Sequence, residues 1–517
     1  MDRMKRNIIA NYAGTIWIAA AQILFVPTYI HYLGMEAYGL IGFYTTLQVW
    51  LMLLDFGLTP TINREMARYR GGASDPAYIR TLLHTLEVAC LAIAVVGFSL
   101  VAVGSNWLSM HWFKLHRLTP PEVRVAIVMM GAVVATRWVS NFYRGALQGL
   151  QKQVWMNVAW TIFVTIRSVG VLAILAWVSP TIKAYFIFQG IVSVLEAGVM
   201  RFGVIRSIPQ TGTIASSVPR LLKEHMHFAG RMTLLSILGV AISQSDKIIL
   251  SEMLPLKEFG FYALATTIAN GLLAVAVPVF GAITPKLTEN AARGEVGALV
   301  HNYYVGTELL AILVYPLSAM LIFFGTPLIT AWSGNASLSA HVAPYLPFLT
   351  LGTTFYCLTH MPYGLQLAYA WIRVSIILNA VTVALLIPTL VVLVPRYGPI
   401  TAAIAWAVLN AIGLVVQALA VHRRLLPKGQ NVRWVRLTVV YPSAAVIVLF
   451  CLARFLYSEV MTGMGAIGTL FYISLVTLVG ILSVATIMPS GRRILSQFGA
   501  WVCGINCSRT LPPSAYH

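Results

Sequence analysis

Long apolar segments fill nearly the whole length of this chain and limit the folds that it can adopt. A helix needs roughly 20 mainly apolar residues to cross a hydrocarbon core of about 30 Å. The composition is of the membrane class, because 58% of the 517 residues are hydrophobic and only 10% are charged, whereas soluble domains have about 25% charged residues. Transmembrane β-strands would be about 10 residues long and would alternate apolar with polar side chains. The sequence therefore predicts an all-α polytopic membrane protein.

We expect fourteen transmembrane helices joined by short connections. Their predicted ranges are 7–31, 37–62, 78–104, 123–146, 154–178, 183–206, 228–251, 258–283, 301–326, 341–368, 371–394, 399–421, 434–456 and 466–488. Pro and Gly occur inside several of them, which membrane-spanning helices tolerate. None of the connections is long enough for a folded soluble domain, so we expect the function to reside in the membrane bundle.

The basic residues indicate how the chain is oriented. The formal net charge is +19, but its placement argues against a nucleic-acid partner, because most Lys and Arg lie at alternate connections. These clusters comprise Arg3, Lys5 and Arg6, then Arg64, Arg68 and Arg70, then Arg206, Arg220 and Lys223, then Arg423, Arg424 and Lys428, and finally Arg492 and Arg493. Such asymmetry is the positive-inside pattern, which predicts cytoplasmic termini. The first span is too long for a cleavable signal, so we expect it to remain as an anchor.

An internal repeat indicates how the spans are grouped. YAG at 12–14 corresponds to FAG at 228–230, GMEAYGLIGFYTT at 34–46 to PLKEFGFYALATT at 255–267, and TPTINREMAR at 59–68 to TPKLTENAAR at 284–293. Six spans separate the copies, so both have the same orientation. Transporters built from parallel repeats bind their substrate between the repeats. The predicted organisation is a six-helix lobe at 1–206, a cytoplasmic linker at 207–227, a second six-helix lobe at 228–421, two additional helices at 434–488 and a cytoplasmic tail at 489–517.

Charged residues inside the spans are the candidate site, because a charge at the bilayer centre costs about 2.5–3.5 kcal/mol on insertion scales. Arg137 and Arg167 lie near the middle of the fourth and fifth spans, and no carboxylate lies within a turn or two of Arg137. Their guanidinium groups match phosphate oxygens, so we predict a cationic cavity for an anionic substrate. Arg64 and Arg144 extend this set toward the cytoplasm, although ordinary positive-inside charge is the favoured interpretation for both. GALQG at 145–149 has the spacing of closely packed helices.

The remaining charges have two interpretations, as ion-coupling groups or as structural pairs. They are Asp55, Glu196, Asp246, Lys247 and Glu308. Arg167 and Glu196 are as well explained by a buried structural pair, and Asp246 with Lys247 by a pair at the membrane interface. The five cysteines lack the spacing of a zinc site, and we expect no metal, no cofactor and no catalytic residue.

Three stretches of the chain resemble a known family. They are NYAGTIWIAAAQILFVPTYIHYLGMEAYGLIGFYTTLQVWLMLLDFGLTPTINREMAR at 11–68, FYRGALQGLQKQVWMN at 142–157 and SQSDKIILSEMLPLKEFGFYALATTIAN at 243–270. The chain resembles bacterial polysaccharide transporters, the Wzx-type O-antigen flippases of the multidrug/oligosaccharidyl-lipid/polysaccharide (MOP) exporter superfamily. Asp55, Arg64 and Glu65 fall in the family's pattern for the second span, and Asp246–Lys247 in its pattern for the seventh.

The resemblance implies a function and a set of partners. It implies two six-helix lobes in the bacterial inner membrane and an undecaprenyl-diphosphate-linked oligosaccharide moved from the cytoplasmic to the periplasmic leaflet, with a polysaccharide polymerase and chain-length machinery as further partners. A peptidoglycan-precursor flippase and a cation-coupled multidrug antiporter are the alternatives in the same superfamily. A membrane glycosyltransferase or polymerase is the alternative from another class, but the chain lacks the large external loop or acidic catalytic motif that such an enzyme would usually carry. We therefore expect a transporter and not an enzyme, working by alternating access.

Overall fold

The computed structural model describes residues 17, 21, 23–55, 57–209, 237–460 and 463–502. These residues are helical, apart from turns and one isolated bridge between Lys114 and Pro255. Eleven helices among them are long and apolar enough to cross a membrane, and they coincide one to one with eleven of the predicted spans. The all-α membrane fold is thereby confirmed.

The other three predicted spans are absent from these eleven helices for different reasons. The first and the seventh begin outside the described residues, as do the YAG and FAG copies of the repeat and most of the linker at 207–227. The tenth, predicted at 341–368, is helix α14 (Leu346–Ala368), whose mean hydropathy is lowered by its threonines and by His360.

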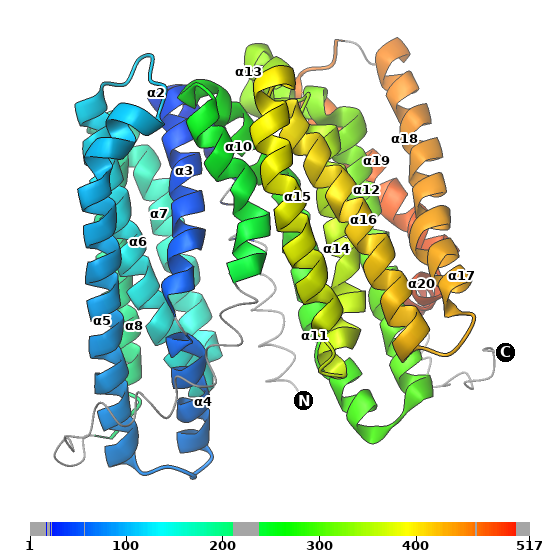
Figure 1. Cartoon of the computed structure of the whole chain (residues 1–517). Coiled ribbons are helices and arrows are strands. Elements are labelled where there is room, and N and C mark those ends of the chain that lie inside the picture. Colours follow the sequence, from blue (N-terminus) through cyan, green and yellow to red (C-terminus); the bar gives the residue numbers. More distant parts are fainter. Residues whose placement is uncertain are drawn as a thin grey trace. The chain divides into compact units, whose positions relative to one another are not determined.

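By its internal contacts the chain forms two compact units. Unit 1 comprises 1–267 and 379–402, and unit 2 comprises 268–378 and 403–517. The lobe boundaries predicted from the repeat stay a prediction. The helices of unit 1 in chain order are α2 (Val26–Leu33), α3 (Met35–Leu51), the 3₁₀ turn η1 (Met52–Asp55), α4 (Leu58–Arg70), α5 (Pro76–Trp107), the π-helical turn η2 (Leu108–Trp112), α6 (Pro120–Gly149), α7 (Gln153–Trp177), α8 (Ile182–Ile205), the helical residues 237–253 and most of α10 (Leu256–Asn270) (Figure 1).

Unit 2 contains most of the remaining helices. In chain order they are α11 (Leu273–Arg293), α12 (Val296–Ser333), α13 (Ala336–Val342), α14, α16 (Ile400–Leu425), α17 (Gln430–Trp434), the π-helical η3 (Val435–Val440), α18 (Tyr441–Val460), α19 (Ala466–Ile487) and α20 (Pro489–Val502) (Figure 1). Helix α15 (Arg373–Tyr397) is divided between the two units. The predicted tail from 489 therefore begins as a helix.

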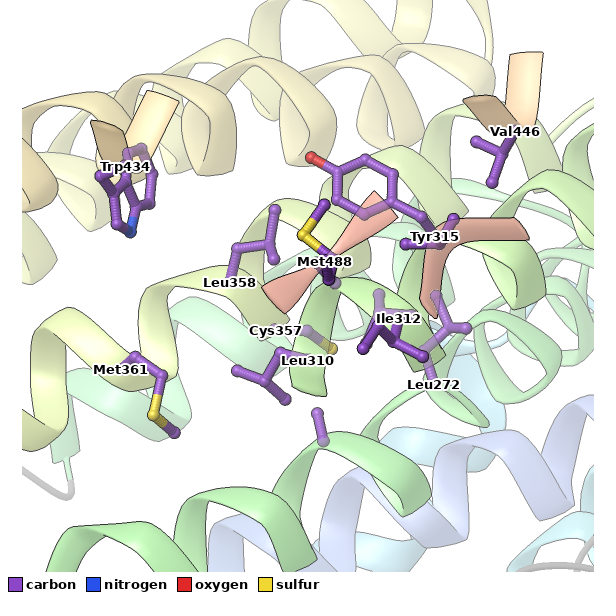
Figure 2. Packing of buried hydrophobic residues seen from close by; sticks show 14 of the residues in the cluster. Leu272, Leu310, Ile312, Tyr315, Cys357, Leu358, Met361, Trp434, Val446 and Met488 are labelled. Carbon is purple, nitrogen blue, oxygen red and sulfur yellow. The ribbon is translucent and has the colours of Figure 1, made fainter. Parts of the chain in front are cut away.

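Apolar side chains lie both inside and outside each unit, as expected for a protein in lipid. In unit 2, side chains from α11, α12, α14, α18 and α19 pack into one buried cluster, which includes Leu310, Tyr315, Leu358 and Val446 (Figure 2). Outward-facing residues are just as apolar, and on α5 Leu100 and Val103 are 66% and 83% exposed. A hydrocarbon solvent explains the second set, because lipid tails accept apolar side chains without cost.

Two spans that the sequence suggested were continuous are interrupted in the structure. The second span stops at η1, and Gly57 adopts a left-handed conformation with φ of 80° before α4 begins. The eighth is interrupted between α10 and α11, where Gly271 and Leu272 form a turn. Non-helical backbone inside a membrane span is tolerated where protein covers it, and at the first interruption Gly57 takes the left-handed conformation without steric cost.

Helices α3 and α10 meet through small residues at equivalent positions of the repeat. A Cβ atom at Gly39 would lie 2.3 Å from the carbonyl oxygen of Leu256, and one at Gly260 would lie 2.8 Å from that of Met35. Gly39 and Gly260 are 221 residues apart, and so are Met35 and Leu256. The contact is therefore reciprocal, as expected where a local two-fold axis relates two copies of one sequence pattern.

Candidate functional site

The candidate site lies in unit 1, where α6 carries two arginines on one face. Arg137 and Arg144 are seven residues apart, which places them on the same side of the helix two turns apart. The Arg137 guanidinium donates to the Tyr44 hydroxyl at 3.0 Å and to the Gln48 side-chain oxygen at 2.9 Å. Tyr44 and Gln48 are one turn apart on α3, so together they hold the group from one side. Both partners are neutral, so the positive charge of Arg137 is not cancelled by them.

Arg167 on α7 forms an ion pair with Glu196 on α8. The Arg167 guanidinium donates to the Glu196 carboxylate, and both side chains are buried. This is the pairing that one of the two interpretations of the sequence suggested. The Nε of Arg167 is buried and has no hydrogen-bond partner among the described residues, so the guanidinium retains donor capacity.

Arg144 joins the same group, although the sequence favoured ordinary positive-inside charge for it. Its guanidinium carbon lies 3.7 Å from the centre of the Trp160 ring on α7, a cation–π contact that fixes its position. Its buried Nε has no hydrogen-bond partner in the described part of the chain. Arg144 is close enough to be repelled by Arg137 and Arg167 and attracted by Glu196.

We call Arg137, Arg144, Arg167 and Glu196 the arginine cluster. Three arginines and one glutamate give the cluster a formal charge of +2, within helices that are apolar enough to span a membrane, and only Arg167 is paired directly with the carboxylate. Unpaired charge is expensive in such a place. An excess of positive charge with spare donors is the arrangement that binds an oxyanion such as phosphate, because guanidinium forks pair with its oxygens.

Arg64 has a different environment. It lies on α4, is half exposed, and pairs with the fully buried Glu65, which also pairs with Arg68. Nearby, α6 approaches α4 closely, since a Cβ at Gly149 would lie 2.2 Å from the carbonyl oxygen of Asn63. The GxxxG spacing in GALQG therefore marks helix packing, as the sequence indicated.

Asp55 lies at the interruption of the second span and accepts hydrogen bonds that stabilise it. Its carboxylate accepts from the Thr59 backbone N–H at 3.2 Å, from the Thr59 hydroxyl at 2.6 Å and from the Trp138 indole N–H at 3.3 Å. The first two bonds satisfy donors at the start of α4, which is the usual role of a side chain at a helix N-terminus. These contacts explain Asp55 as a structural group next to the arginine cluster, since Trp138 adjoins Arg137 on α6.

The two remaining candidate sets also have protein partners. Asp246 accepts from the Tyr262 hydroxyl at 2.7 Å, and Lys247 donates to the carbonyl oxygen of Ser243 at 2.7 Å, with 3.6 Å between the two charges. Both are buried within the protein, and their assignment to the membrane interface stays a prediction. In unit 2, Glu308 on α12 accepts from the Ser490 backbone N–H at 2.7 Å.

Three residues that contact the arginine cluster were not predicted from the sequence. Tyr44 and Gln48 carried a signal, because two polar groups spaced by one turn inside an apolar span require a partner there. Trp160 carried none, since an aromatic residue in a membrane helix is common. The described residues contain no group of His, Cys, Asp and Glu arranged to hold a metal ion.

Comparison with known proteins identifies a family and a relative for this chain. A family model described as "Polysaccharide biosynthesis protein" matches residues 4–291, more than half of the chain. A Shigella flexneri protein named "Putative O-antigen transporter" is 20% identical over 380 residues, covering 73% of this chain and 87% of that protein.

Solved structures show the same fold at low sequence identity. A lipid II flippase MurJ in an inward closed conformation has a TM-score of 0.69 at 16% identity, over 93% of this chain and 98% of that one. A multidrug resistance MATE family transporter of the MOP superfamily has a TM-score of 0.60 at 12% identity, over 84% of this chain and 96% of that one. The fold is that of the MOP superfamily, and the chain belongs to the polysaccharide biosynthesis protein family.

Proposed function

We propose that this protein is a flippase that moves an undecaprenyl-diphosphate-linked oligosaccharide from the cytoplasmic to the periplasmic leaflet of the bacterial inner membrane by alternating access. The observation that carries the proposal is the charge of the arginine cluster. A diphosphate is the strongly anionic part of such a lipid, and three arginines opposed by one carboxylate provide a complement to it within spans that otherwise exclude charge. The family and the Shigella relative support a polysaccharide intermediate as the cargo.

Arg137 is the residue most directly available to the diphosphate. Its protein partners Tyr44 and Gln48 are neutral, so a phosphate would supply the counter-charge that the protein leaves out. Arg144 is held against Trp160 and presents a second guanidinium on the same face of α6. Arg167 shares its charge with Glu196, and we assign it the supporting role of keeping the cluster positive. We place Arg64 outside the cluster, at its cytoplasmic side.

The charge sign separates this proposal from a multidrug antiporter for cationic compounds. A cluster with a formal charge of +2 repels a cationic drug, and acidic residues facing the substrate would be required instead. A peptidoglycan-precursor flippase stays as the second candidate, because its cargo carries the same polyprenyl diphosphate. The two are distinguished by the sugar, so the test must vary the glycan while keeping the diphosphate.

The proposal is tested by transport in proteoliposomes with a fluorescent polyprenyl-diphosphate oligosaccharide. Arg137→Ala is expected to lower the transport rate by about 10- to 100-fold, because a hydrogen bond to a charged group contributes about 1.5–3 kcal/mol. Arg137→Lys keeps the charge and is expected to have a smaller effect. Arg124→Ala is the matched control, because Arg124 is an exposed cation on the same helix.

Two further substrates complete this test. A polyprenyl-monophosphate saccharide should be transported poorly by the parent protein and should show little difference between Arg137→Ala and the parent. A diphosphate carrying the peptidoglycan precursor decides between the two candidate cargoes. Parent-like transport of the diphosphate oligosaccharide by Arg137→Ala would remove Arg137 from the site.

A further inference from the structure

Helix α20 is fixed at the end of a membrane span by contacts that control its direction. Only Met488 separates it from α19, and its extended backbone, with ψ of 135°, ends one helix before Pro489 begins the next. The Arg492 guanidinium donates to the carbonyl oxygens of Thr486 at 2.8 Å and Ile487 at 3.1 Å. These are the carbonyls that the end of α19 leaves without helical partners. These contacts stabilise the bend between α19 and α20, so α20 does not continue the direction of α19.

Glu308 attaches the start of α20 to the body of unit 2. Its buried carboxylate accepts from the Ser490 N–H, one of the donors at the first turn of α20. A carboxylate at a helix N-terminus is also favoured by the helix dipole. Gly491 fits against this bend because a Cβ there would lie 2.3 Å from the carbonyl oxygen of Ala485. Helix α20 packs on both α12 and α19, and in Figure 1 it lies beside the end of α19.

The sequence of α20 is that of an amphipathic helix. Apolar residues occur in PSGRRILSQFGAWV at 494, 495, 498, 501 and 502, the spacing of one apolar helical face. The positions between them, 496, 497, 499 and 500, are polar or small, and Arg492 and Arg493 precede them near the start of the helix. Of the described side chains, Leu495 packs on the buried cluster of unit 2, while Ile494 is 49% exposed and Arg493 is exposed.

The position of α20 at the end of a membrane span determines that its apolar and basic side chains meet the surface of the bilayer. A helix that starts one residue after a membrane span and is tied back to another span cannot leave the bilayer boundary. Helices with an apolar face and a basic polar face lie in that boundary, with the apolar face about 5–10 Å into it, and are attracted to anionic lipids. We propose that α20 lies in the cytoplasmic lipid–water interface and that Arg493 binds anionic phospholipid headgroups there. In this arrangement Glu308 positions α20.

The proposal is tested by amide hydrogen exchange of residues 489–502 in the full-length protein, reconstituted in nanodiscs of either phosphatidylglycerol or phosphatidylcholine. Exchange is expected to be slower in phosphatidylglycerol, and Arg493→Glu should remove this difference. The expected change is roughly fivefold or more, because each basic residue near an anionic surface contributes on the order of 1 kcal/mol. High salt should reduce the difference in the parent protein.

Four further variants make the outcome decisive. Lys257→Glu, which changes an exposed cation on α10, should leave the lipid dependence of α20 unchanged. Ile494→Glu should speed exchange in both lipids, because it places a charge on the apolar face, and Glu308→Gln should weaken the attachment in both. Unchanged hydrogen exchange of α12 shows that each variant is folded. If Arg493→Glu does not fold, Arg493→Gln replaces it as the variant that removes the positive charge. Equal exchange in the two lipids, or a lipid dependence that Arg493→Glu and Arg493→Gln both leave intact, would overturn the proposal. The measurement requires no transport and is independent of the proposed cargo.

Discussion

A guanidinium group inside a membrane span needs polar partners, and the kind of partner decides what the group can do. Arg137 is held by a hydroxyl and an amide oxygen, which satisfy its hydrogen bonds and leave its charge in place. Arg167 is held by a carboxylate, which cancels most of its charge. The sequence placed both residues at mid-span and offered Glu196 as a partner for Arg167. It did not show what holds Arg137, because Tyr44 and Gln48 come from a helix about 90 residues earlier in the chain.

The Arg167–Glu196 pair makes a prediction about stability. Arg167→Met or Glu196→Leu alone should destabilise the protein by about 3–5 kcal/mol, because each leaves a buried charge without its partner. The double variant Arg167→Met/Glu196→Leu should be much more stable than the sum of the two effects implies. Thermal unfolding in detergent measures all three, and a double variant whose loss equals the sum would show that the pair is not coupled.

At the scale of single helices, glycine determines where neighbouring helices approach most closely. Gly39 on α3 and Gly260 on α10 each meet a backbone carbonyl oxygen of the other helix. A carbonyl cannot move aside as a flexible side chain can, so a methyl group at either position forces the helices apart. The same reasoning applies to Gly149, which meets the backbone of α4.

This contact predicts that its two sides are equally sensitive. Gly39→Ala and Gly260→Ala should each lower stability by about 1–3 kcal/mol, the usual effect of overpacking. Gly281→Ala on α11 is the matched control, since a Cβ there meets nothing within 4 Å, and it should be neutral or slightly stabilising because alanine favours the helix. Midpoints of thermal unfolding in one detergent compare the three. Parent-like midpoints for both α3 and α10 variants would contradict the close approach.

At the scale of the whole molecule, the orientation in the membrane follows from charge. Basic residues are concentrated at alternate connections, which predicts cytoplasmic termini and a cytoplasmic connection between α4 and α5. The connection between α7 and α8 is then periplasmic.

Cysteine labelling measures this orientation. In a background without native cysteines, Ser179→Cys between α7 and α8 should react with a membrane-impermeant maleimide added to spheroplasts. Ala73→Cys between α4 and α5 should react only after the membrane is permeabilised. The reverse pattern would invert the orientation and with it the direction of transport that we propose.

Composition and periodicity alone show that the chain is an all-α membrane protein, where eleven of its spans lie and that a segment of α3 is repeated in α10. These properties depend on local composition and period, because a bilayer demands about 20 apolar residues per helix wherever the helix packs. The sequence also located Arg137, Arg167 and Glu196, since a charge within an apolar run is visible without a structure.

Which charges meet and which helices bend became visible only in the three-dimensional structure. The structure placed Arg144 against Trp160 and within electrostatic reach of Arg137 and Arg167, assigned Glu308 to the start of α20, and divided the second span at Gly57. Each of these depends on groups brought together from distant parts of the chain. The local sequence cannot settle them, because an arginine near the end of a span has the same neighbours in the chain whether it faces water, lipid or another helix, and only packing selects among the three.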